Sequence, residues 1–127
     1  FYMSFIIRNT PKEHNYAYYR CLNRYGAIFT VFQIEQLADR CQKVCDSNPY
    51  LFTSGWDRIF TEQEILWDSK IMRIDRLMVN TAEKVVLIAD YKSGDIYDFN
   101  QLANYKTALS KLSVLKGYNI DTRIVIV

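Results

Sequence analysis

The spacing of apolar residues along the chain changes near residue 57, and before that point it is helical. Thr10 followed by Pro11 predicts an N-cap and the first turn of a helix over residues 12–25. A second helix is expected over residues 30–46, where apolar side chains recur at helical spacing. The positions expected to form its apolar stripe are Phe32, Leu37, Cys41 and Val44.

After residue 57 the apolar period becomes two, which is typical of β-strands. Strands are expected at Arg58–Trp67, 70–79 and 84–92. Short polar turns separate them, so the pattern predicts an antiparallel meander. The last of these strands contains a continuous apolar run, Val85 to Ala89, and is therefore expected to lie buried in the centre of the sheet.

A helix over residues 98–116 and a β-branched strand over 122–127 complete the chain. A long helix between two strands is the usual connection when those strands run parallel in one sheet. The pattern therefore predicts an α/β fold. It consists of a mixed sheet with a three-strand meander, a crossover helix and a final strand, preceded by N-terminal helices.

The composition is that of an ordinary globular protein, with 50% hydrophobic and 24% charged residues in a chain of 127. This excludes a disordered chain and fits one domain. A net charge of +2 permits a nucleic-acid partner without favouring one. No apolar run approaches the roughly 20 residues of a membrane span, and no signal peptide is visible. We therefore expect no membrane partner.

The chain has three cysteines, Cys21, Cys41 and Cys45. An odd number without a secretory signal favours a reducing cytosol. Cys41 and Cys45 are four residues apart on an expected helix, and we expect them to pack as small apolar side chains. A zinc site is disfavoured because it needs four ligands, and the single histidine, His14, has no obvious companions.

Charged residues interrupt the most apolar strand. Asp90 and Lys92 are two residues apart, so they project from the same face, and Asp75 lies on the neighbouring strand of the meander. Two close carboxylates need a proton or a cation, and oxygen ligands suit Mg²⁺ or Mn²⁺. With a lysine beside it, such a metal suits phosphodiester hydrolysis. The alternative is a structural Asp90–Lys92 ion pair, with Asp75 bonded to Arg73 or Arg76.

Gln101 and Tyr105 lie four apart on the helix that follows, so they share a face of it. Both side chains can contact a phosphate or a base of a bound strand. Alternatively, Tyr105 packs in the core and Gln101 is a surface residue.

With these residues in order, the chain resembles the RecB-like branch of the PD-(D/E)XK nuclease superfamily. The resemblance is carried by Arg73-Ile74-Asp75-Arg76, Ile88-Ala89-Asp90-Tyr91-Lys92-Ser93-Gly94 and Gln101-Leu102-Ala103-Asn104-Tyr105. These stretches are similar to the family's motifs G-x-x-D, D-Y-K-T/S-G and Q-x-x-x-Y. From about residue 56 onward the chain is similar to nuclease domains at the C-terminus of UvrD-like or AddA-like helicases.

The resemblance implies a restriction-endonuclease-like core over residues 57–127, with residues 1–56 as the helical part of the same domain. It implies that Asp75, Asp90 and the Tyr91 backbone carbonyl bind Mg²⁺ or Mn²⁺ and that Lys92 is catalytic. Gln101 and Tyr105 would bind substrate. The implied function is a metal-dependent (exo)deoxyribonuclease in the bacterial cytoplasm. It would act on single-stranded DNA, with a helicase domain or subunit as partner, in repair or recombination.

Three features depart from the family pattern or limit the expectation. Met72 stands where the family has glycine, and no residue clearly fills the first motif, for which the candidates are His14, Glu35, Glu62 and Glu64. Some family members hold an iron–sulfur cluster, which needs four cysteines, several of them downstream of the Q-x-x-x-Y motif. This chain has three cysteines, all upstream of that motif, so we expect no cluster. Because the chain begins with Phe1 rather than Met, we expect a piece of a larger helicase–nuclease. The rival interpretations are a catalytically silent DNA-binding or scaffolding module, and an RNA-processing nuclease of the same fold.

Overall fold

The computed structural model describes residues 1–93 and 99–127, which form two compact units. One unit comprises Phe1–Thr53 with Val127, and the other comprises Ser54–Ile126. We call them the helical unit and the sheet unit. The described residues contain three α-helices and a four-stranded mixed sheet, so the predicted α/β class is confirmed.

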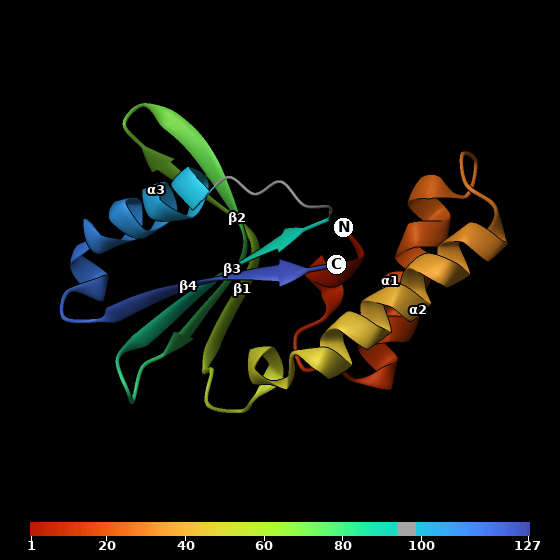
Figure 1. Cartoon of the computed structure of the whole chain (residues 1–127), viewed down its shortest axis with the longest axis horizontal. Coiled ribbons are helices and arrows are strands. Elements are labelled where there is room, and N and C mark those ends of the chain that lie inside the picture. The colour runs from red at the N-terminus through yellow and green to blue at the C-terminus, as the bar shows by residue number, and fades with distance from the viewer. Residues whose placement is uncertain (94–98) are drawn as a thin grey trace. The chain divides into compact units, whose positions relative to one another are not determined.

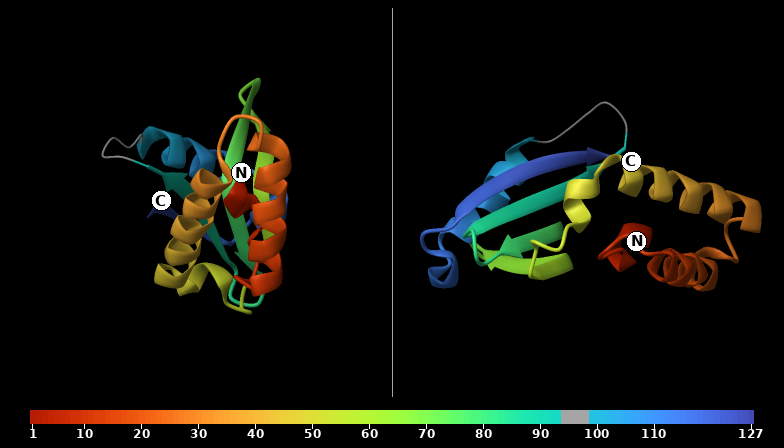
Figure 2. Two further views of the ribbon diagram at one scale, coloured as in Figure 1. Left: turned by 90° about the vertical axis from the view of Figure 1, so that its right-hand side faces the viewer. Right: turned by 90° about the horizontal axis from the view of Figure 1, so that it is seen from below.

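The helical unit is a hairpin of two helices (Figures 1 and 2). Its elements are α1 (Pro11–Tyr25), α2 (Val31–Ser47) and two short 3-10 turns, η1 (Tyr2–Phe5) and η2 (Pro49–Phe52). Both helices begin with a capping box, in which a threonine side chain accepts a hydrogen bond from the backbone N–H three residues on. Thr10 caps α1 and Thr30 caps α2, so the predicted helix starts agree with the structure within one residue.

The interior of the helical unit is built from small and apolar side chains, and the three cysteines are free thiols buried in it. Burial, followed by the influence of Cys21, raises the pKa of the Cys41 thiol to about 11, so that thiol stays neutral. The predicted apolar stripe of α2 is wrong at Phe32, which is 66% exposed. Phe32 precedes the buried Ile34 by two residues, about 200° around a helix, and therefore faces the opposite side.

The sheet unit contains β1 (Arg58–Trp67), β2 (Lys70–Asn80), β3 (Val85–Lys92) and β4 (Asn119–Ile126). The strands follow one another across the sheet in chain order (Figure 2). The pairs β1–β2 and β2–β3 are antiparallel, and β3–β4 is parallel. The predicted meander and parallel final strand are therefore confirmed.

The crossover helix, α3 (Phe99–Ser110), is shorter than predicted. We expected a helix over 98–116, but it ends at Ser110, a short 3-10 turn (η3, Ser113–Leu115) follows, and β4 begins at Asn119 rather than at 122. Residue 98 lies outside the described residues. Val114 is 78% exposed, so the final turns of a longer helix would have little apolar support. No described helix has the length and apolar character needed to cross a lipid bilayer.

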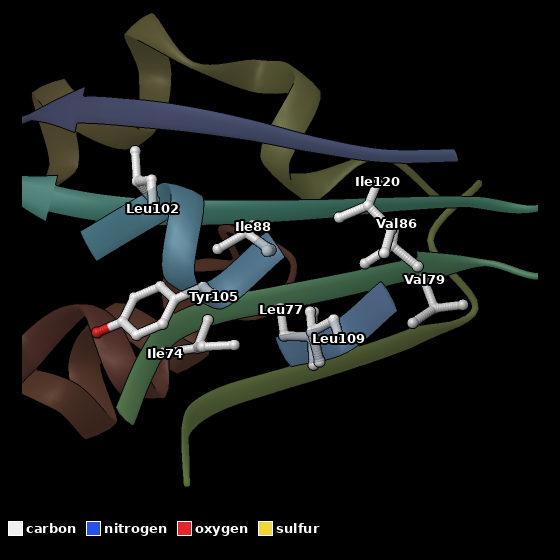
Figure 3. Close-up of a cluster of buried hydrophobic side chains, with 9 residues drawn as sticks. All are labelled: Ile74, Leu77, Val79, Val86, Ile88, Leu102, Tyr105, Leu109 and Ile120. Carbon is white, nitrogen blue, oxygen red and sulfur yellow. The ribbon is translucent and has the colours of Figure 1, made fainter. Parts of the chain in front are cut away.

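α3 packs on one face of the sheet (Figure 3). Its contribution to this core is Leu102, Tyr105 and Leu109, and the sheet contributes Ile74, Leu77, Val79, Val86, Ile88 and Ile120. Side chains alternate along β3, so residues 90 and 92 project from the same face as Val86 and Ile88. The fold thus directs Asp90 and Lys92 toward the side of the sheet that α3 covers.

Candidate active site

Asp75 and Asp90 lie side by side on adjacent strands. Ala89 of β3 pairs with Arg76 of β2, and the aspartates are the next residues along each strand. The Asp90 carboxyl group is close enough to Asp75 to raise its pKa, and the Tyr91 backbone N–H donates to Asp75 Oδ2 at 2.9 Å. The structure thus brings together the two carboxylates that the sequence placed on neighbouring strands.

Lys92 links the carboxylates to α3. Its Nζ lies 3.0 Å from Asp90 Oδ2 and donates a hydrogen bond to Gln101 Oε1 at 3.1 Å. The Asp90 side chain is 5% exposed, whereas that of Lys92 is 28% exposed. The Asp–Lys ion pair considered as a structural alternative is therefore present, within the same group as the second carboxylate. The ammonium group thus lies at ion-pair distance from a buried charge, and the lysine side chain still reaches solvent.

Burial is the main reason that the pKa of Asp75 rises from 3.8 to about 6. The hydrogen bond and charge of Asp90 act in the same direction, whereas the Tyr91 N–H and the charge of Lys92 oppose it. The pair therefore retains a proton at weakly acidic pH, as expected for two carboxyl groups that cannot both ionise at low cost. A divalent cation could replace that proton.

The aspartates open into a cavity of about 610 Å³ between the ends of β2 and β3 and the first turns of α3. It is lined by all six predicted site residues, Asp75, Asp90, Tyr91, Lys92, Gln101 and Tyr105, and also by Ile71, Met72, Arg73 and Asn104. Met72, at the glycine position of the family motif, forms part of the wall.

Arg73 and Asn104 are polar cavity residues that the sequence analysis did not select. Their positions follow the same periodicities as the selected ones. Arg73 precedes Asp75 by two residues on β2, and Asn104 follows Gln101 by three residues on α3. Applying these periodicities to every polar neighbour of the motifs could have identified both.

Tyr105 combines the two roles considered for it. It is 3% exposed, its ring belongs to the core under α3 (Figure 3), and it also lines the cavity. Its hydroxyl donates to the Arg73 carbonyl at 2.7 Å, which ties α3 to β2. Burial raises the pKa of this hydroxyl, and Asp90 and Asp75 add to the shift. Tyr105 is therefore a neutral anchor of the cavity wall.

The candidates for the first family motif lie on elements of both units. His14 lies in the helical unit, with Nδ1 2.8 Å from the Tyr2 hydroxyl and Nε2 2.6 Å from Asn9 Oδ1. Burial lowers the pKa of its imidazole. The carboxylate candidates are exposed: Glu35 on α2, and Glu62 and Glu64 on β1. Within residues 1–93 and 99–127, no three His, Cys, Asp or Glu side chains are grouped closely enough to hold one metal ion.

Comparisons of this chain with models of protein families, with curated proteins and with solved structures found no match. The mixed α/β architecture is therefore known from the structure itself.

Proposed function

We propose that the sheet unit is a restriction-endonuclease-like nuclease core that hydrolyses DNA phosphodiester bonds with Mg²⁺ or Mn²⁺. The observation that carries the proposal is the carboxylate pair. Asp75 and Asp90 lie side by side on adjacent strands at one end of the sheet, with the Lys92 ammonium 3.0 Å from Asp90 Oδ2. The RecB-like motif order in the sequence supports the same function.

The residues present fit a hard divalent cation. Both side-chain donors are carboxylate oxygens. Burial, together with the neighbouring Asp90, raises the pKa of Asp75, and a bound cation would offset this cost of ionising the pair. Asp75, Asp90 and the Tyr91 backbone carbonyl would hold it. When bound, Mg²⁺ supplies Lewis acidity, which stabilises the negative charge that develops on a phosphoryl oxygen during hydrolysis.

Lys92 is the residue we assign to the reacting phosphate. An ammonium group has three N–H donors; one donates to Gln101 Oε1, and the group lies at ion-pair distance from Asp90 Oδ2. We assign another of its donors to a phosphate oxygen or to the attacking water. Because Asp90 and Gln101 fix the ammonium group from two elements, little reorganisation would be needed during the reaction.

Substrate binding is assigned to the other polar residues of the cavity wall. Arg73 is exposed on β2 and can pair with a phosphate through its guanidinium group. The amides of Gln101 and Asn104 can donate to phosphate or to base edges. Tyr105 is assigned a positioning role, because its hydroxyl already donates a hydrogen bond to the Arg73 carbonyl.

The substrate class and the partner extend the same proposal. Single-stranded DNA, delivered by a helicase domain or subunit during repair or recombination, is inferred from the helicase-type motifs. A net charge of +2 is modest for a protein that captures DNA unaided, which favours delivery by a partner.

Cleavage of an end-labelled single-stranded oligonucleotide in Mn²⁺ tests the proposal. Asp90→Asn and Lys92→Ala are each expected to reduce the rate by at least about 100-fold, because each removes charge stabilisation at the reacting group. Asp121→Asn, an exposed charge change on β4, is the matched control and should cleave normally. Cleavage at the wild-type rate by the first two variants would refute the assignment.

A second candidate, a catalytically silent DNA-binding or scaffolding module, is favoured by one observation. Within the described residues only two carboxylates meet, and no third side-chain ligand joins them. Calorimetry with Mn²⁺ distinguishes the candidates. A heat of Mn²⁺ binding that is present in the wild type and absent in Asp90→Asn supports the nuclease. DNA binding with neither a heat of Mn²⁺ binding nor cleavage supports the silent module.

A further inference from the structure

Helix α1 carries a row of cationic and aromatic side chains in the helical unit. Lys12, Tyr16, Arg20 and Arg24 follow one another at intervals of four residues, so they form one stripe along the helix. We call these four residues the α1 stripe. The three cations are exposed, and Tyr16 is 53% exposed. None of them belongs to the cavity around Asp75 and Asp90.

Aromatic rings hold both guanidinium groups of the stripe. Arg20 Cζ lies 5.4 Å from the centroid of the Phe5 ring and 5.9 Å from that of Tyr16. Arg24 Cζ lies 4.7 Å from the centroid of the Phe1 ring and 5.5 Å from that of Tyr25. A guanidinium stacked on a ring keeps its N–H edges for another partner, and its plane is already oriented.

The positive charge of the stripe is not neutralised nearby. In the described part of the chain, no ion pair involves Lys12, Arg20 or Arg24. The only acidic residue of α1 is Glu13, and its carboxylate accepts backbone N–H bonds from the segment that precedes the helix. A small cavity of about 390 Å³ lies against the two arginines and is also lined by Phe1 and Asn23.

An exposed ring lies next to the stripe. Tyr19 is 56% exposed and touches Tyr18 edge-on, with ring centroids 5.5 Å apart. Tyrosine faces beside oriented guanidinium groups are the combination that binds single-stranded nucleic acid, because bases stack on rings while cations contact phosphates. An acidic protein surface would form ion pairs with the arginines, but it has no bases to stack on the tyrosine rings.

We propose that the α1 stripe, with Tyr19 and Asn23, is a binding surface for single-stranded DNA. Arg20 and Arg24 pair with backbone phosphates, Tyr16 and Tyr19 stack on unpaired bases, and Asn23 contacts a base edge or a sugar. The choice of DNA as the nucleic acid rests on the proposed nuclease function. Binding at this surface needs neither a metal nor cleavage.

The test is fluorescence anisotropy of a labelled oligodeoxythymidylate of about 20 nucleotides with the full chain in EDTA, where cleavage cannot occur. The variant is Arg20→Gln with Arg24→Gln. Its matched control is Arg40→Gln with Lys43→Gln, which removes the same charge from exposed positions of α2. The first pair is expected to weaken binding at least tenfold. It should also reduce the slope of log affinity against log salt by about 1.4, since two phosphate contacts are lost. The control pair should change affinity less than threefold.

A second variant separates stacking from general electrostatics. Tyr19→Ala is expected to weaken binding of the single strand by about tenfold and to leave binding of a blunt duplex nearly unchanged. Circular dichroism confirms that each variant is folded. Equal losses in the two double variants would overturn the proposal. So would displacement of the oligonucleotide by polyglutamate as efficiently as by unlabelled DNA, which would indicate an acidic protein partner.

Failure of this surface can be distinguished from failure of the nuclease site. Binding in EDTA that depends on Arg20 and Arg24, together with no cleavage in Mn²⁺, supports the surface and refutes only the nuclease. Cleavage that depends on Asp90, together with unchanged binding by the double arginine variant, refutes only the surface.

Discussion

At the residue scale, Asp75 is an acid held in an environment that differs strongly from water. Burial and the adjacent Asp90 favour its neutral form, and its pKa rises from 3.8 to about 6. An acid with a pKa higher in the folded than in the unfolded chain contributes stability below its unfolded pKa. That contribution is lost as the pH rises through the folded value. The relevant pH window is therefore from about 4 to 6, and stability falls toward neutral pH.

Asp75→Asn should remove this pH dependence. In EDTA, the wild-type free energy of unfolding is expected to fall, relative to the variant, by about 1–2 kcal/mol between pH values near 4 and 7.5. This figure is reduced from the full shift because the site is partly open to water. Urea unfolding at both pH values measures the difference, and Asp121→Asn should retain the wild-type slope.

Residue positions were predictable where a fixed periodicity decides them. Alternation along a strand placed Asp90 beside Lys92, and the meander placed Asp75 next to Asp90, as the structure has them. The bond from the Tyr105 hydroxyl to the Arg73 carbonyl was not predictable. Its acceptor is a backbone atom, and every residue has that atom, so no pattern of residue types marks it.

At the element scale, the beginnings of α1 and α2 were predictable and the end of α3 was not. Thr10 and Thr30 cap their helices through side chains three residues from their partners, a local signal that is readable in the sequence. The end of α3 has no such signal, because no Gly or Pro lies between Ser110 and Gly117. It depends on where the chain must turn to pair β4 with β3, which is a property of the folded sheet.

The attachment of α3 to β2 can be tested with Tyr105→Phe. The change keeps the ring in the core and removes the hydroxyl that donates to the Arg73 carbonyl at 2.7 Å. The free energy of unfolding is expected to fall by about 1 kcal/mol, the usual net value of one partly buried hydrogen bond. Urea unfolding measures it, with the exposed Tyr19→Phe as the control. An unchanged stability would mean that water replaces the hydroxyl at this carbonyl.

At the scale of the whole molecule, net charge conceals where the charges lie. The total of +2 gave no indication of a partner, yet the sheet unit gathers two carboxylates in one cavity and the helical unit gathers cations along α1. Salt screens exposed charges beyond the Debye length of about 10 Å, so a partner responds to the charges grouped near it. The local grouping of charges therefore matters more than the net charge of the chain. Composition therefore could not reveal either surface, although motif spacing revealed one.

The effect of Mn²⁺ on the stability of the whole chain tests the carboxylate pair without any assay of cleavage. An ion that binds only the folded state adds about 2.7 kcal/mol to the free energy of unfolding at 100 times its dissociation constant. The gain should vanish in Asp75→Asn and Asp90→Asn and persist in Asp121→Asn. It should also shrink near pH 5, because the ion must then displace the proton held by Asp75, whose pKa is about 6. Urea unfolding with Mn²⁺ or EDTA measures each gain. Equal gains in all three variants would show that the ion binds elsewhere. The proposal of a metal-dependent nuclease would then be refuted, because it rests on metal binding by Asp75 and Asp90.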